Sequence, residues 1–197
     1  MLKVGVTGGI GSGKSFVSNR MKELGAFIFN ADAEAKQILD ENQHVQEQLA
    51  EEFGADILNP DGTINKNRLA IRGFANEDAQ AVLNAIIHPS VFKKIDTQFD
   101  KISQGKKYSI FIVDAALIYE SGLDQHLDYV IVVTAQLGIR IKRAMERSSL
   151  SRDEIQKRID LQLPEETKVE MADFVIENDG TKEHLIKQID KIYEQLI

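Results

Sequence analysis

The chain has 197 residues, of which 31 are acidic and 24 are basic, giving a formal net charge of −7. This length suits one domain with at most an inserted subdomain, and the acidic balance argues against nucleic acid as a partner. The absence of cysteine excludes disulfides, cysteine–zinc sites and thiol nucleophiles. With no long apolar run and no secretion signal, we expect a cytoplasmic protein without a membrane partner, either a monomer or a small homo-oligomer.

The first predicted elements are a strand and a glycine loop. Leu2, Val4 and Val6 belong to a short apolar run typical of a buried strand. The next stretch is Gly8-Gly9-Ile10-Gly11-Ser12-Gly13-Lys14-Ser15, which fits the phosphate-loop pattern G-x-x-x-x-G-K-[ST]. Helical spacing then runs from Phe16 to Leu24. Strand, glycine loop and helix in this order predict a site for a nucleotide polyphosphate.

The residue types of the loop match what that chemistry requires. Glycines leave room for a phosphate to lie against backbone N–H groups at a helix N-terminus, where the partial positive charge favours anions. Lys14 supplies a cation for the β- and γ-phosphates, and Ser15 a hydroxyl for Mg²⁺. We therefore predict nucleotide binding by Gly9, Gly11, Ser12, Gly13, Lys14, Ser15 and Phe16.

A long helical stretch follows the second strand. Residues 26–29 read as that strand, which ends at Asn30, and residues 33–53 are predicted to be helical. Further helices are predicted within 66–104, with a break near His88-Pro89. Because residues 33–105 offer no good strand, we expect a helical insertion between the second and third strands.

The remaining elements alternate between strands and helices. Strands are predicted at 108–114, 129–133 and 174–176, and helices at 136–147, 151–162, from Pro164 onwards, and at 181–197. This pattern predicts an α/β fold with a five-stranded parallel sheet covered by helices on both faces. Ligands of such sheets bind beyond the carboxyl ends of the strands, which should bring the glycine loop, Asp32, Asp114 and Glu120 to one edge.

Three carboxylates at this edge could take part in the chemistry. Asp32 follows the second strand and could accept the proton of an acceptor hydroxyl, or simply cap the next helix. Asp114 ends the third strand, as a Walker B carboxylate does, and could hold Mg²⁺ or only end a buried strand. Glu120 could cap a helix or hold a cationic partner.

Two further features could contact the substrates. The segment 137–163 is rich in arginine, and its residues Arg140, Arg143 and Arg147 share one helix face. Such a segment could close over a triphosphate as a lid, or could be a solvated helix face with internal ion pairs. His88 is a candidate substrate contact, although a lone histidine is more often a hydrogen-bonded structural group.

In these residues the sequence resembles the bacterial dephospho-coenzyme A kinase family over nearly its whole length. The matching positions, in family order, are Thr7 to Ser15, Asn30-Ala31-Asp32, Phe53-Gly54, Asp61-Gly62, Arg68-Leu69, Leu83-Asn84, His88-Pro89, Leu117 to Glu120, Arg143, Arg147, Arg158, Gln162 and Ala172 to Gly180. Three positions depart from the family pattern: Asn30 stands in place of Asp, Phe16 in place of Thr and Ala116 in place of Pro.

The resemblance implies an enzyme that transfers the γ-phosphoryl of ATP to the ribose 3′-hydroxyl of dephospho-CoA, with Mg²⁺ as cofactor. It implies a nucleotide-binding core (1–32, 106–136 and 164–197), a helical substrate domain (33–105) and a lid (137–163). Asp32 would be the base, and Arg140 and Arg143 would neutralise developing charge beside Lys14. Asn178 would contact the nucleotide. The expected substrate contacts are Asp32, Asn84, His88, Leu117 and Glu120.

Two other functions remain open on the sequence. The first is another small-molecule or nucleoside monophosphate kinase on the same core. The second is a GTPase switch or regulatory nucleotide-binding module, which needs a guanine-reading Asn-Lys-x-Asp. Asn65-Lys66 is followed by Asn67-Arg68 and lacks that aspartate.

Overall fold

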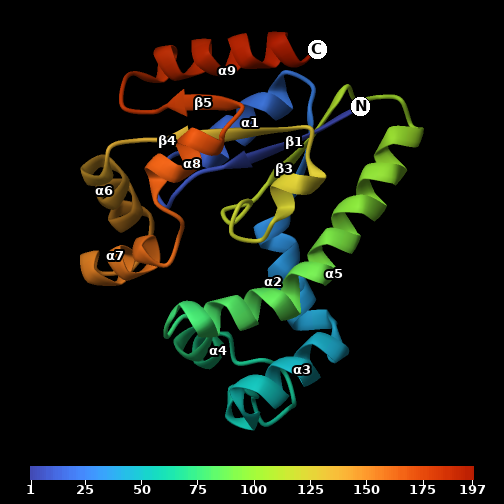
Figure 1. Ribbon diagram of the computed structural model, residues 1–197, viewed down its shortest axis with the longest axis vertical. Coiled ribbons are helices and arrows are strands. Elements are labelled where there is room, and N and C mark those ends of the chain that lie inside the picture. Colours follow the sequence, from blue (N-terminus) through green and yellow to red (C-terminus); the bar gives the residue numbers. More distant parts are fainter. The chain divides into compact units, whose positions relative to one another are not determined.

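A five-stranded parallel sheet forms the centre of the larger of two structural units. The computed structural model describes residues 1–197, and its strands follow the order β2-β3-β1-β4-β5 (Figure 1). The strands are β1 (Leu2–Thr7), β2 (Phe27–Asn30), β3 (Ile110–Asp114), β4 (Tyr129–Thr134) and β5 (Phe174–Glu177). The prediction of an α/β fold with five parallel strands is confirmed.

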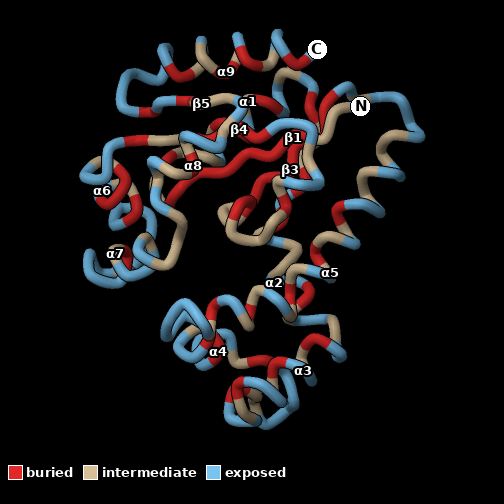
Figure 2. The backbone as a smooth tube through the Cα atoms, viewed as in Figure 1, coloured by how far each residue is buried: buried red, intermediate tan, exposed pale blue.

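The sheet is buried because its strands are apolar on both faces. The interiors of β1, β3 and β4 are almost completely buried, and Figure 2 shows them in red. Helices α1 (Lys14–Glu23) and α9 (Lys182–Leu196) add Met21 and Ile189 to the same core. An ion pair also joins these two helices, since Arg20 Nε and Asp190 Oδ1 lie 2.8 Å apart. The phosphate loop therefore leads into a helix that is packed firmly against the sheet.

The chain divides into two compact units. The first comprises residues 1–30 and 97–197, and the second comprises residues 31–96. Besides the sheet, the first unit contains η2 (Leu123–His126), α6 (Leu137–Arg147), α7 (Arg152–Asp160) and α8 (Glu165–Met171). Helices α6 and α7 pack on each other through Ile141, Ala144 and Ile155.

The second unit is helical. It contains α2 (Ala31–Glu41), α3 (Gln43–Phe53), η1 (Ala55–Ile57), α4 (Lys66–Gly73) and most of α5 (Glu77–Gln104). Residues 33–53 are helical, as predicted, and they divide into α2 and α3. The chain leaves the helical conformation at Asn42, whose side chain accepts a hydrogen bond from the Val45 amide at 3.2 Å and caps α3.

The predicted break at His88-Pro89 is wrong, because α5 continues through Pro89. Proline removes one backbone donor from a helix and crowds the preceding turn. Here the buried positions Leu83, Ile87, Val91 and Ile95 recur every four residues on both sides of the proline. Burial of this continuous apolar stripe offsets the local cost of the proline. None of the helices combines the length and apolar character that a membrane span requires.

Candidate functional site

The glycine loop runs from the carboxyl end of β1 into α1. Within it, the Ser12 amide donates to the Gly9 carbonyl at 3.0 Å, and Gly13 is the N-cap of α1 with φ of 101°. That backbone conformation suits glycine and disfavours residues with a side chain. The loop thus opens onto a helix N-terminus, the arrangement that binds phosphate through backbone amides.

Two loop glycines are also required by close contacts with other parts of the protein. A Cβ on Gly9 would lie 2.0 Å from Nη2 of Arg140, and a Cβ on Gly13 would lie 2.2 Å from Nδ2 of Asn178. The sequence pattern attributes these glycines to phosphate binding alone. The structure adds that the Arg140 and Asn178 side chains occupy the space of a Cβ at these positions, so a side chain at either glycine would displace them.

Lys14 forms an ion pair with Asp114 at the end of β3. Both side chains are largely buried, with 15 % and 6 % of their surface exposed. Asp114 lies beside Val6 in β1 and Asn30 in β2 in the sheet register. The expectation that Asp114 reaches the loop edge is therefore confirmed, and its partner in this structure is the loop lysine.

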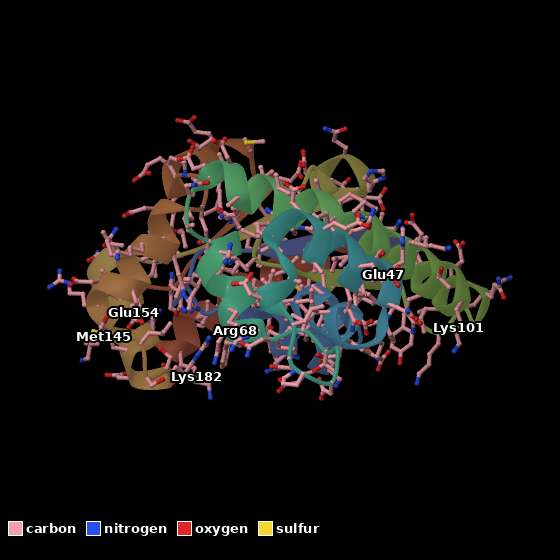
Figure 3. All side chains as sticks on the ribbon, turned by 90° about the horizontal axis from the view of Figure 1, so that it is seen from below. Glu47, Arg68, Lys101, Met145, Glu154 and Lys182 are labelled. Atoms are coloured by element: carbon pink, nitrogen blue, oxygen red, sulfur yellow. The ribbon has the colours of Figure 1, made fainter.

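Two hydroxyl groups of the loop differ in their surroundings. The Ser12 hydroxyl is buried and has no hydrogen-bond partner. Ser15 is exposed, so its hydroxyl is accessible to a ligand. The next residue, Phe16, is half-buried, and Nζ of Lys182 lies 5.4 Å from its ring centroid. Figure 3 labels Lys182, which begins α9.

The predicted lid arginines occupy different environments on α6. Arg140 is 4 % exposed, donates from Nε to the Ile10 carbonyl at 3.1 Å and forms an ion pair with Glu165. Burial lowers the pKa of its guanidinium, and the Glu166 carboxylate opposes that effect. The arginine nevertheless stays charged near neutral pH, because its ordinary pKa lies far above that range.

Arg143 points to the loop that follows β5. Its Nη2 donates to the Asn178 carbonyl at 3.0 Å, whereas its Nη1 is buried without a partner. Arg147 is exposed at the end of α6. Met145 on α6 and Glu154 on α7, both labelled in Figure 3, lie on the exposed surface of this helix pair. Only Arg140 and Arg143 thus contact the loops around the predicted nucleotide site.

A cavity of about 650 Å³ opens beside the glycine loop. Gly9 and Arg140 line one part of it. Another part is lined by Gln162 and Leu163 from the segment between α7 and α8 and by Glu165 and Lys168 from α8. Both cations in its wall are engaged by carboxylates, since Arg140 pairs with Glu165 and Lys168 pairs with Glu120. The cavity therefore joins the phosphate loop to the predicted lid segment.

The segment after β3 contains the predicted substrate contacts Leu117 and Glu120. Leu117 is half-buried. Glu120 Oε1 lies 2.6 Å from Nζ of the buried Lys168 and accepts a hydrogen bond from the Leu163 amide at 3.0 Å. Its other oxygen, Oε2, is buried without a partner. Of the alternatives open for Glu120, a cationic partner is present, and its second oxygen is left without a hydrogen bond.

Three predicted substrate residues lie in the helical unit. Asp32 is the second residue of α2, two positions after the end of β2. Asn84 and His88 are half-buried on α5 and are one turn apart, so they share a helix face. The His88 ring stacks on Phe92 with centroids 5.9 Å apart.

Sequence reasoning missed Glu165, Lys168 and Thr134. The Thr134 hydroxyl and the Ala135 amide both donate to Glu165 Oε1. No motif marks Glu165, because an acidic residue in the first turn of a helix is common. Lys168 reads as an ordinary surface lysine, yet it is 2 % exposed. Only the fold brings these side chains to the cavity beside the glycine loop.

Comparison with known proteins identifies the family of the chain. The family model described as dephospho-CoA kinase matches residues 2–184. A dephospho-CoA kinase of Corynebacterium glutamicum is 38% identical over 198 residues, covering 100% of this chain and 98% of its own. Among solved structures, TT1252 from Thermus thermophilus is 28% identical with a TM-score of 0.83, covering 100% of this chain and 98% of its own.

The dephospho-CoA kinase from Campylobacter jejuni is 30% identical, with a TM-score of 0.70 over 98% of this chain and 96% of its own. The family match spans most of the chain, and the relatives match it over nearly their full length. The chain therefore belongs to the dephospho-CoA kinase family, the kinases that phosphorylate dephospho-CoA with ATP in coenzyme A biosynthesis.

Proposed function

We propose how this chain carries out the reaction of its family, the transfer of the γ-phosphoryl of ATP to the ribose 3′-hydroxyl of dephospho-CoA. The observation that carries the proposal is the phosphate loop, whose Lys14 meets Asp114 at the carboxyl edge of the sheet. In the reaction the bond between the γ-phosphorus and the bridging oxygen breaks, and a bond to the 3′-oxygen forms. ADP leaves, and the hydroxyl proton passes to a carboxylate.

The donor side of the proposal rests on the loop and α6. The amides of Gly9, Gly11 and Gly13, with the N-terminus of α1, hold the phosphates, and Ser12 contributes its side chain. The unpartnered Ser12 hydroxyl and the unpartnered Nη1 of Arg143 are polar atoms that a phosphate could satisfy. Lys14 and Arg140 supply positive charge, which stabilises the transition state when it is held in place beforehand.

The residues at the loop suit magnesium bound jointly with a nucleotide. The exposed Ser15 hydroxyl is a ligand candidate and the nearby Asp114 carboxylate a second, while the phosphates and water would complete the shell. Bound there, the ion supplies electrostatic stabilisation of the phosphate oxygens. The protein offers no group of three or more acidic or histidine ligands for a metal, which fits an ion held largely by the nucleotide.

The acceptor side is assigned to the following residues. Asp32 accepts or orients the 3′-hydroxyl proton, and Asn84, His88, Leu117 and the free oxygen of Glu120 contact dephospho-CoA. We further propose that residues 33–105 act as the substrate domain and 137–163 as the lid. A cytoplasmic location is proposed as well, because the donor is ATP and the chain has no cysteine.

An ADP-coupled assay with ATP and a panel of acceptors tests this function. We expect strong turnover with dephospho-CoA and little with AMP or shikimate, the acceptors of the alternative kinases. Asp32→Asn should lower kcat by roughly 100-fold or more without a loss of stability, because the carboxylate that takes the proton is gone. Near-normal turnover of Asp32→Asn would show that another group is the base, while turnover of AMP or shikimate alone would reject the acceptor.

A further inference from the structure

The Arg140 side chain is buried and held in one position against the glycine loop. Its Nε donates to the Ile10 carbonyl at 3.1 Å, and its Nη2 occupies the space in which Gly9 would carry a Cβ. Only 5 % of its side chain is exposed. An arginine side chain has many rotamers, and confining it to one is unfavourable unless a partner holds the guanidinium.

That partner is Glu165, the first residue of α8. Its Oε2 forms the ion pair with Nη1 of Arg140. Its Oε1 accepts from the Thr134 hydroxyl and from the Ala135 amide, the latter at 3.3 Å. One oxygen of the carboxylate is therefore hydrogen-bonded to the end of β4, and the other is paired with the arginine. Glu165 thus links the guanidinium to the sheet.

We propose that Glu165 is a positioning residue for the phosphoryl transfer, which holds Arg140 against the glycine loop before ATP binds. The proposal rests on the role given to Arg140 under the proposed function. A cation that must reorient during the reaction stabilises the transition state less than one already in place. Glu165 supplies that preorganisation, and the Thr134 hydroxyl supplies the rigid support.

The position of Glu165 also connects Arg140 to the segment between α7 and α8. Glu165 follows Leu163 by two residues, and the Leu163 amide is held by Glu120, which in turn pairs with Lys168. The segment is thus tied to the sheet unit on both sides of Pro164. A displacement of this segment would carry Glu165 away from Arg140 and would alter the charge presented to the loop.

The test compares Glu165→Gln, Arg140→Ala and the double variant in the full chain, by steady-state kinetics with ATP and dephospho-CoA. Glu165→Gln keeps the size of the side chain and an oxygen for Thr134, but it loses the charge that holds the guanidinium. We expect kcat to fall about 10- to 100-fold, the effect of a misplaced reacting group, with KM for dephospho-CoA within about twofold. Glu165→Asp should recover part of kcat.

Non-additivity is the decisive readout. If Glu165 acts through Arg140, then Glu165→Gln in the Arg140→Ala background should lower kcat no further. Glu170→Gln is the matched control, because Glu170 is an exposed acidic residue on the same helix, whereas the carboxylate paired with Arg140 is that of Glu165. We expect it to retain kcat within about twofold, with thermal unfolding monitored for all variants.

The outcomes separate the two proposals. If Arg140→Ala keeps its kcat, the role of Arg140 in the proposed function fails. If Arg140→Ala loses kcat while Glu165→Gln keeps it, or if the two effects add, the positioning role is overturned. A lower KM for ATP with unchanged kcat in Glu165→Gln would also overturn it, because the carboxylate would then compete with phosphate for the arginine.

Discussion

The side-chain amide of Asn178 donates to the carbonyl of Ser12 at 2.7 Å, joining two residues 166 positions apart in the chain. Asn178 follows β5 and is 9 % exposed, while Ser12 lies in the phosphate loop. The resemblance to the kinase family assigns Asn178 to the nucleotide. In this structure, its side chain also holds the backbone of the loop that receives the phosphates.

The first prediction concerns this bond. Asn178→Ala leaves a buried carbonyl unsatisfied, which should cost roughly 1–3 kcal/mol in the free energy of unfolding. It should also raise KM for ATP, because the loop is less well ordered. Urea unfolding measures the loss of stability, and initial rates at varied ATP concentration measure KM for ATP. In the control Gln188→Ala, which removes exposed hydrogen bonds to Glu177, KM for ATP should not change.

The second prediction concerns Lys14 and Asp114. Lys14→Met should lower kcat by roughly 100-fold or more, since the cation at the phosphates is lost. The variant should also lose stability, because Asp114 would remain as an unpaired buried carboxylate, at a cost of about 3 kcal/mol.

The double variant Lys14→Met/Asp114→Asn separates the two roles. It should recover most of the lost stability in urea unfolding, because no unpaired charge is left, while kcat stays low. A double variant as unstable as Lys14→Met would mean that Asp114 is not the source of the destabilisation. Recovery of turnover would contradict the role of Lys14 in catalysis.

The sheet and the loop could be predicted because their signals are local. The apolar runs such as Val4 to Val6 and the complete loop ending in Lys14-Ser15 carry their structural meaning within about ten residues. Pro89 shows the limit of such signals. Proline predicts a break, but the apolar stripe that includes Ile87 and Val91 continues across it, and tertiary packing decides the outcome.

The charge network could not be predicted, because it depends on contacts between distant segments. Glu165 and Arg140 are 25 positions apart, and Glu120 and Lys168 are 48 apart, with no motif to link either pair. A lysine or glutamate on a helix is normally exposed and solvated. Only the parallel sheet, which brings the end of β4 beside α8, explains why Glu165 lies between Thr134 and Arg140.

The third prediction concerns pH. Tyr119 is buried, and burial together with the charges of Asp173 and Asp124 raises its pKa to about 12. In the unfolded chain a tyrosine ionises near pH 10. Between these values the unfolded state releases the proton first, so the free energy of unfolding should be fully retained below about pH 10 and should fall as the pH rises towards 12.

Tyr119→Phe tests this assignment. The hydroxyl has no hydrogen-bond partner, so its removal should leave stability at pH 7 unchanged or raise it by about 1 kcal/mol. At pH 11 the variant should exceed the wild type by a larger margin than at pH 7. Urea midpoints at both values measure the difference. An equal margin at both values would show that Tyr119 does not contribute to alkaline unfolding.

The last prediction concerns Glu120 and Lys168. Lys168→Met should destabilise the protein by about 3 kcal/mol, because it leaves the Glu120 carboxylate buried and unpaired. Glu120→Gln/Lys168→Met should be more stable than Lys168→Met, since glutamine can still accept the hydrogen bond from the Leu163 amide. Urea unfolding of the wild type, Lys168→Met and the double variant measures these differences in the free energy of unfolding. If the double variant is no more stable than Lys168→Met, the ion pair is not what stabilises the segment.

The kinetics of the same double variant test whether Glu120 contacts the acceptor. In a variant with near-normal stability, a rise in KM for dephospho-CoA without a change in KM for ATP would support the free oxygen of Glu120 as a substrate contact. An unchanged KM for dephospho-CoA would assign Glu120 to the segment between α7 and α8 alone. The residue would then affect phosphoryl transfer only by holding Leu163, two residues before Glu165.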